Sequence, residues 1–105
     1  MVYDDRPPAP CGVQTLSGGD GVTRTRHGMG TQYGVVTLSY NANTVPDMFD
    51  IHVDGLLIAT TGDFVQGEGT LTFYYSGGTV IVTVTGGQTE GGPPTTWDYV
   101  ISCPT

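Results

Sequence analysis

The chain contains no lysine, and only three arginines oppose ten aspartate and glutamate residues, which gives a formal net charge of −7. Nucleic-acid phosphates and anionic lipid headgroups attract proteins mainly through lysine and arginine. This charge balance therefore argues against nucleic acid and anionic membranes as partners. No run approaches the roughly 18 apolar residues that a membrane span requires, so we also expect no membrane insertion.

Motifs of nucleophilic and metal-dependent enzymes are missing as well. The sequence contains no GxSxG, HExxH or CxxC motif, and it has two histidines, His27 and His52. The glycine-rich segments HGMG and SGGDG open no predicted helix, so they indicate turns and not phosphate-binding loops. A domain of 105 residues built from short strands rarely forms a deep cleft. We therefore expect a protein that is not an enzyme and needs no cofactor.

The two cysteines, Cys11 and Cys103, lie near opposite ends of the chain. Their wide separation does not fit a zinc site, which needs closely spaced ligands. Two buried free thiols and a disulfide both remain open. We favour the disulfide, because it suits a small domain in an oxidising exterior and alternation places both side chains inward. In the chain-entropy model a loop of roughly 90 residues makes such a bond worth roughly 4–5 kcal/mol.

Short alternating runs separated by glycine-rich turns predict an all-β fold. The expected strands span residues 12–16, 22–27, 34–40, 48–53, 56–60, 69–75, 79–85 and 96–103. The pair Asp54 and Gly55 is the strongest hairpin signal, and residues 76–78 are the second. The pattern predicts an antiparallel β-sandwich or jelly roll of about seven to eight strands in residues 11–105. Residues 1–10, rich in proline and acidic, form an extended N-terminal arm and do not have the pattern of a signal peptide.

Alternation within each run predicts which side chains face the core. The expected inward sets are Phe49, Ile51 and Val53; Leu71, Phe73 and Tyr75; Val80, Val82 and Val84; Val36, Leu38 and Tyr40; Cys11 and Val13; and Trp97, Tyr99, Ile101 and Cys103. Ile81 is expected at the rim of the core, and Tyr74 on the outer surface.

Residues 45–60 carry a row of carboxylates around a histidine. If Phe49 faces inward, the outward set is Asp50, His52 and Asp54. Asp47 is expected in a turn just before the strand. We favour a solvated strand face, with Asp54 as a turn residue. The alternatives are a Ca²⁺ site at Asp47 and Asp50, since oxygen ligands suit this ion, and an acid/base pair.

Two features are candidates for contacts with a partner. Tyr74, with Thr70 and Thr72 beside it, is placed to pack against a neighbouring subunit or to stack on a sugar. An extended proline-rich segment can lie along a partner at little ordering cost. The candidate docking residues of the arm are Tyr3, Asp4, Asp5, Arg6, Pro7 and Pro8.

One set of framework motifs is more specific than a generic sandwich. A strand ends at Tyr40, VPD follows at residues 45–47, FDIHVDG at residues 49–55, GEGTLTF at residues 67–73, and WDYVISCP at residues 97–104. This order resembles a small β-sandwich found in bacteriophage virion proteins and in some secreted bacterial proteins. The resemblance covers residues 10–104 and concerns turns and core positions, so it implies a fold and carries over no catalytic residue.

The resemblance implies a structural role on a virion surface, as a capsid decoration or cement protein or as a tail or fibre accessory protein. The expected partners are other virion proteins or copies of the same chain. The alternative from another class is an extracellular carbohydrate-binding or adhesin module, Ca²⁺-assisted, that binds a cell-surface glycan through Tyr74 and the region of Asp47 and Asp50.

Overall fold

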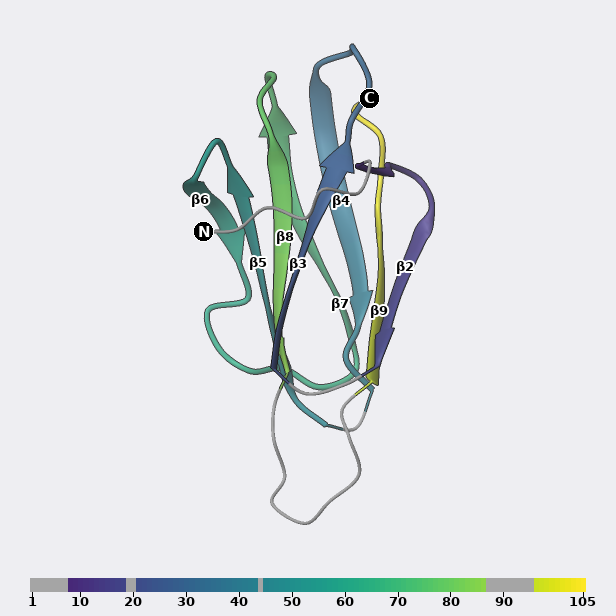
Figure 1. Cartoon of the computed structure of the whole chain (residues 1–105), viewed down its shortest axis with the longest axis vertical. Coiled ribbons are helices and arrows are strands. Elements are labelled where there is room, and N and C mark those ends of the chain that lie inside the picture. The colour runs from purple at the N-terminus through teal and green to yellow at the C-terminus, as the bar shows by residue number, and fades with distance from the viewer. Residues whose placement is uncertain (1–7, 19–20, 44, 87–95) are drawn as a thin grey trace.

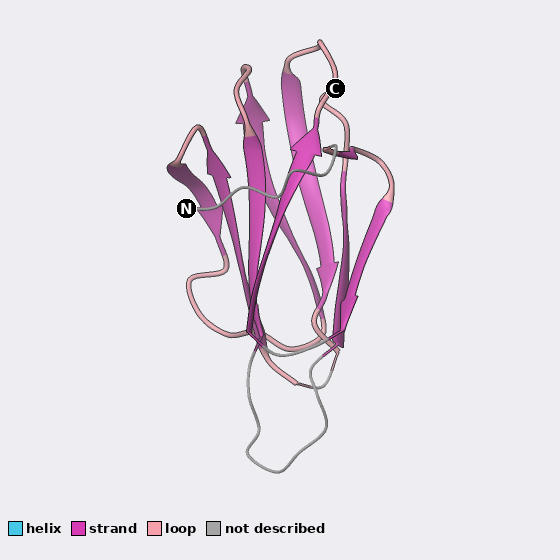
Figure 2. Ribbon diagram, viewed as in Figure 1, coloured by secondary structure: helices cyan, strands magenta, loops and turns pink. Residues whose placement is uncertain are grey.

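The computed structural model describes residues 8–18, 21–43, 45–86 and 96–105, and these residues form two packed sheets (Figures 1 and 2). The strands are β1 (Ala9–Pro10), β2 (Gln14–Gly18), β3 (Gly21–Gly28), β4 (Gly34–Asn41), β5 (Asp47–Val53), β6 (Leu56–Thr60), β7 (Glu68–Tyr75), β8 (Val80–Gly86) and β9 (Thr96–Ile101). The five-stranded sheet has the order β1-β3-β8-β5-β6, and the four-stranded sheet has the order β2-β9-β4-β7. The predicted all-β sandwich is therefore confirmed.

The eight expected strands correspond to β2 through β9, with ends displaced by at most two residues. The ninth, β1, lies in the segment that we assigned to the arm. Ala9 and Pro10 pair in parallel with His27 and Gly28 of β3. Pro10 can occupy this position because β1 is the last strand at its end of the sheet, where a proline interrupts no ladder. The rest of the arm, residues 1–7, lies outside the described residues.

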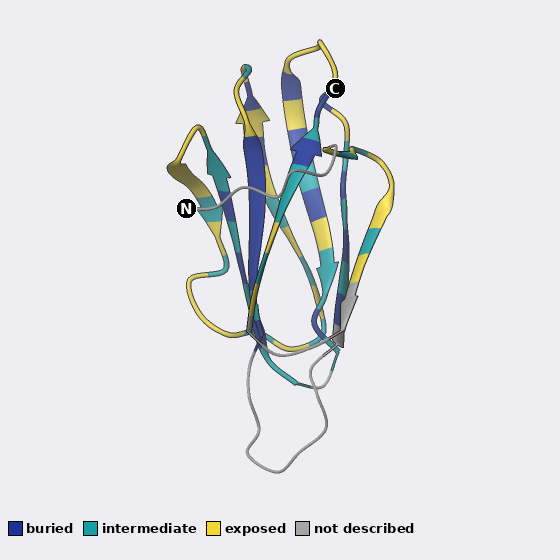
Figure 3. Cartoon of the chain, in the orientation of Figure 1, coloured by how far each residue is buried: buried dark blue, intermediate teal, exposed yellow. Residues whose placement is uncertain are grey.

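The core lies between the two sheets, and β8 is buried along most of its length (Figure 3). Alternation predicted most of the buried set correctly. The buried apolar side chains are Met29, Val36, Leu38, Ala42, Phe49, Ile51, Phe73, Tyr75, Val80, Ile81, Val82, Val84, Trp97, Tyr99 and Ile101. Ile81 was expected at the rim but is only 7 % exposed. It lies on the central strand of its sheet and pairs with Arg26 on one side and with His52 on the other.

The two predicted hairpins have different outcomes. Asp54 and Gly55 form the turn between the antiparallel strands β5 and β6, and both have positive φ, as a type I′ turn requires. Residues 76–78, in contrast, lead from β7 in one sheet to β8 in the other. The second hairpin prediction is therefore wrong. Glycines with positive φ at Gly77 and Gly78 mark a sharp turn, but they do not determine whether the flanking strands pair.

The predicted disulfide is confirmed, because Cys11 and Cys103 are bonded with their Cα atoms 5.0 Å apart. The expectation that both side chains face the core is wrong for Cys103, which is exposed, whereas Cys11 is half-buried against the core. β9 ends at Ile101, whose carbonyl oxygen accepts a hydrogen bond from the amide of Gly12. The alternation of β9 therefore does not extend to residue 103.

Candidate functional site

The row of carboxylates on β5 is divided between the two faces of the strand. Asp50 and His52 are half-buried on the outer face and Asp54 is exposed, as expected. Asp47 was expected in a solvated turn but is fully buried, because it is the first residue of β5 and shares the inward face with Phe49. Its backbone pairs with Val65 in a two-residue bridge. The position of Asp47 in the alternation would have predicted this burial.

The Ca²⁺ candidates Asp47 and Asp50 consequently project from opposite faces of β5, and the structure does not bring them together. Asp50 instead accepts a hydrogen bond from the hydroxyl of Thr60 on β6. In the part of the chain that is described, no three His, Cys, Asp or Glu side chains are grouped as metal ligands would be. Asp54 links the β5–β6 turn to the residue that precedes β8, since its carboxylate accepts a hydrogen bond of 2.9 Å from the amide of Thr79.

Tyr74 faces outward as predicted, with 65 % of its surface exposed. It lies on β7, the last strand of the four-stranded sheet, opposite Val35 of β4, which is itself 46 % exposed. Of the other residues that we assigned to partner binding, Pro8 is exposed beside Gly28. Tyr3, Asp4, Asp5, Arg6 and Pro7 lie outside the described residues.

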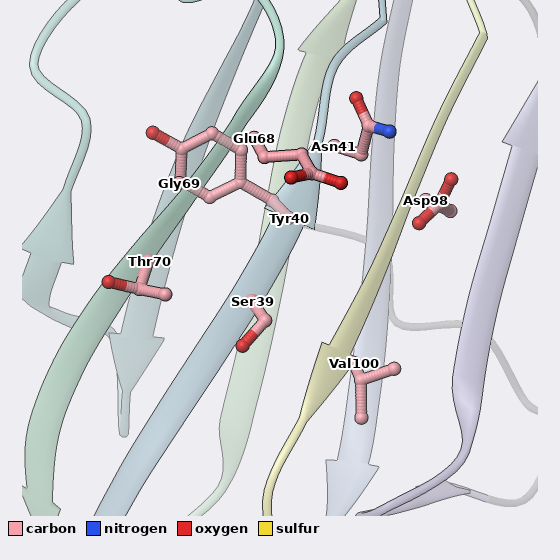
Figure 4. Close-up of a pocket in the computed structure, with 8 residues that line it drawn as sticks. All are labelled: Ser39, Tyr40, Asn41, Glu68, Gly69, Thr70, Asp98 and Val100. Carbon is pink, nitrogen blue, oxygen red and sulfur yellow. The ribbon is translucent and has the colours of Figure 1, made fainter.

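The outer face of the four-stranded sheet contains a hollow of about 480 Å³ (Figure 4). It is lined by Ser39, Tyr40, Asn41, Glu68, Gly69, Thr70, Asp98 and Val100. The strand register creates its polar floor, because Asn41 pairs with Glu68 on one side and with Asp98 on the other. Side chains opposite one another on the same face lie about 5 Å apart. An amide is therefore flanked by two carboxylates, with the hydroxyls of Ser39 and Thr70 in the next row.

The bottom of this hollow depends on Tyr40 and Gly69. The ring of Tyr40 stacks on Phe49 with centroids 4.6 Å apart, so it belongs to the inner side of the sheet. It lies across Gly69, where a Cβ atom would collide with the ring. Gly69 therefore allows the tyrosine to pass beneath β7. The sequence motif GEGTLTF contains this glycine, but its role depends on the pairing of Tyr40 with Gly69 between strands.

A second hollow, of about 290 Å³, lies on the outer face of the five-stranded sheet. It is lined by Val22, Arg24, Asp50, His52, Gly55, Ile81, Thr83 and Thr85. Thr83 separates Arg24 from Asp50, because it pairs with both in the strand register. This hollow therefore holds both a guanidinium group and a carboxylate, whereas the described residues that line the hollow of Figure 4 include two carboxylates and no cationic side chain.

Sequence reasoning missed a buried polar pair between the sheets. His27 of β3 and Tyr99 of β9 are joined by a hydrogen bond of 2.6 Å between Nε2 and the phenol oxygen. Burial lowers the pKa of His27 to about 4 and raises the pKa of Tyr99 to about 12. Both groups are therefore neutral at pH 7, and the pair links the sheets. The alternation of β3, which places His27 with Thr25, was the available signal.

The functional groups that the described residues present to solvent lie in these two hollows and on the exposed side chains. Within the described residues, no helix is long and apolar enough to cross a membrane. Comparison of the chain with protein families, curated proteins and solved structures found no family model, relative or structural neighbour that matches it.

Proposed function

We propose that the chain is a non-enzymatic structural protein of a bacteriophage virion surface, a capsid decoration or tail accessory protein that acts by protein–protein association. The resemblance of its framework motifs to virion β-sandwiches supports the virion setting. The association itself is supported by one observation above the others. The strand β6, at the open edge of the five-stranded sheet, exposes three consecutive apolar side chains.

The sequence of β6 is LLIAT, with no charged residue. Leu56, Leu57 and Ile58 are 67 %, 49 % and 42 % exposed, and Phe64 just beyond the strand is 45 % exposed. Sheet edges that remain solvated usually carry charges or prolines, which prevent pairing with another chain. An edge without these protections is a site for a partner protein, which can add backbone hydrogen bonds and bury the apolar side chains.

Incorporation of the chain into particles tests this proposal. We expect Leu56→Asp to reduce the amount of chain bound to particles at least tenfold, because a buried carboxylate at the contact would lack a partner. Val13→Asp is the matched control, since Val13 is 55 % exposed but lies outside β6, and it should bind normally. Both variants should melt within a few degrees of the wild type. Equal incorporation of Leu56→Asp and wild-type chain would contradict a contact at β6.

The hollow of Figure 4 supports a second candidate, an extracellular glycan-binding module. Carboxylate, amide and hydroxyl groups match the hydroxyls of a sugar in their hydrogen-bonding capacity. The residues first expected to bind the glycan do not meet, because Tyr74 lies on β7 of the four-stranded sheet, whereas Asp47 and Asp50 lie on β5 of the five-stranded sheet. A glycan-array screen tests this candidate, with Asn41→Ala and Glu68→Gln as variants that should abolish any signal. A signal that both variants retain would exclude the hollow as the binding site.

A further inference from the structure

The second hollow, of about 290 Å³, lies over β8, the strand between β3 and β5 (Figure 1), and is called the β8 hollow below. Its floor is low, since Ile81 and Thr83 of β8 are only 7 % and 9 % exposed. The strand register aligns Arg24 of β3, Thr83 and Asp50 of β5 in one row. In the next row on the same face, Ile81 pairs with His52 of β5. A guanidinium group and a carboxylate therefore lie on opposite sides of a partly apolar floor.

We propose that the β8 hollow binds a sugar acid, which is a sugar ring that carries a carboxylate. Arg24 binds the carboxylate, because a guanidinium group can donate two parallel hydrogen bonds to it. Asp50 and His52 bind hydroxyl groups at the far side of the ring, and Thr83 lies beneath it. The site goes beyond the proposed association through β6 and does not depend on it, since none of the lining residues belongs to that strand.

The distance between the two charged groups favours a ring over a smaller zwitterion. Arg24 and Asp50 are two strands apart, about 9–10 Å between their Cα atoms. The carboxylate of Asp50 accepts a hydrogen bond from Thr60 of β6, on the side away from Arg24. A ligand that contacts both groups must therefore hold its carboxylate and its other polar groups several atoms apart. A sugar ring does this, whereas an α-amino acid carries both of its charges on one carbon.

The rest of the lining suits the two kinds of surface on a sugar ring. The hydroxyl groups of Thr83 and Thr85 can both donate and accept hydrogen bonds, as sugar hydroxyls do. Ile81 and Val22 offer apolar surface to the C–H groups of the ring. Ligand pockets combine apolar lining with a few polar groups and have volumes of roughly 300–1,000 Å³. The β8 hollow, at about 290 Å³, therefore matches one sugar ring better than a longer glycan.

The charge of the ligand distinguishes this hollow from the hollow of Figure 4, where Glu68 and Asp98 would repel a carboxylate. The net charge of −7 repels anions at long range, so the attraction must come from direct contact with Arg24. Arg24 is exposed, and a hydrogen bond to the ligand replaces hydrogen bonds to water. We therefore expect a weak site, with a dissociation constant on the order of 1 mM.

Titration of the purified, isotope-labelled full chain with D-glucuronate, followed by NMR, tests the proposal. The backbone amide signals of Arg24, Asp50 and Thr83 should move as the probe binds. D-glucose has the same ring without the carboxylate, and acetate has the carboxylate without the ring, so each should bind at least tenfold more weakly. A short polymer of glucuronic acid identifies the source of the ligand. Tighter binding of the polymer than of the monomer indicates a polysaccharide, and equal binding indicates a single sugar acid.

Two variants test the roles of the charged groups. Arg24→Gln should weaken the binding of D-glucuronate at least tenfold. Asp50→Ala should also weaken it, although this change removes a negative charge and by itself favours the approach of an anion. The variant therefore separates contacts in the hollow from general attraction. Asp63→Ala is the control, since it removes the same charge from an exposed loop outside the hollow, and it should bind as the wild type does.

Four results would overturn the sugar-acid site. Wild-type signals could stay unchanged up to about 50 mM D-glucuronate, well above the expected dissociation constant. Acetate could bind as tightly as D-glucuronate, which would leave only a contact with an anion. Arg24→Gln could bind as the wild type does, or Asp50→Ala could bind more tightly. Thermal unfolding of each variant identifies any that fail to fold, and Arg24→Lys then replaces Arg24→Gln, with an expected loss of at least threefold.

Discussion

The imidazole of His27 and the phenol of Tyr99 lie 2.6 Å apart and join β3 of one sheet to β9 of the other. The centroids of the two rings are 5.5 Å apart in an edge-on arrangement. Tyr99 is fully buried and packs against Trp97 and Phe49 as well. The pair therefore places a titratable group in the centre of the apolar core, and this has a consequence for stability.

Acidification should destabilise the fold through His27. Its pKa is lowered to about 4 from the ordinary 6.5, so between these values the unfolded chain binds the proton and the folded chain does not. The free energy of unfolding should therefore fall by on the order of 3 kcal/mol as the pH falls from 6.5 to about 4. Urea unfolding at several pH values measures this change.

Two variants isolate the contribution of His27 to this pH dependence. In His27→Gln the part of the pH dependence that comes from the histidine should disappear, although stability at pH 7 also drops. His52→Gln, on the outer face of β5, should keep the dependence of the wild type. An identical pH dependence in the wild type and His27→Gln would contradict the buried, neutral histidine.

Substitution of Gly69 should displace the Tyr40 ring, which forms the bottom of the hollow in Figure 4. The Cβ of Gly69→Ala collides with the Tyr40 ring and displaces it from Phe49, at a cost of on the order of 1–3 kcal/mol in the free energy of unfolding. Thr70→Ala, at an exposed neighbouring position, should change it by less than about 0.5 kcal/mol. If Gly69→Ala unfolds at the same urea concentration as the wild type, the ring does not occupy this position.

Calcium should have little effect on stability. Asp47 and Asp50 lie on opposite faces of β5, so neither can share an ion with the other. We expect EDTA or added Ca²⁺ to move the melting temperature by less than about 2 °C. A shift above about 10 °C would instead mean several kcal/mol of linked binding in a domain of this size, and would require a calcium site that we have not recognised.

Removal of the N-terminal arm should separate folding from assembly. Deletion of residues 1–7 should leave the sandwich folded, with a melting temperature within a few degrees of the wild type. Deletion of residues 1–10 should lower it further, since Ala9 and Pro10 pair with β3. If the arm docks on a partner, the shorter deletion also weakens incorporation into particles. Unchanged incorporation would exclude the arm as a contact and leave the β6 edge, which Leu56→Asp tests, as the proposed one.

Alternation along single strands accounts for the parts of the fold that were predicted correctly. Phe49 and Ile51 face inward and Tyr74 faces outward, because successive side chains of a strand point to opposite faces. The disulfide could also be predicted, since two cysteines near opposite ends of a small domain do not fit a zinc site. Asp47 was missed although the same alternation applies to it, because a preceding proline suggested a turn.

The remaining features depend on pairing between distant strands. The hollow of Figure 4 exists because β4 lies between β7 and β9 in a register that aligns Asn41 with Glu68 and Asp98. A glycine turn such as residues 76–78 allows either a hairpin or a crossing between sheets. Local pattern contains no information on these choices, which depend on how the two sheets pack as a whole.

Cryo-electron microscopy of the particles made from the genome that encodes this chain tests the proposed role on the virion surface. We predict density for the two-sheet sandwich in repeated copies on the outer surface, with the β6 edge in contact with another virion protein. Particles of normal composition that lack the chain, while the protein is found free in the medium, would contradict a structural role on the virion.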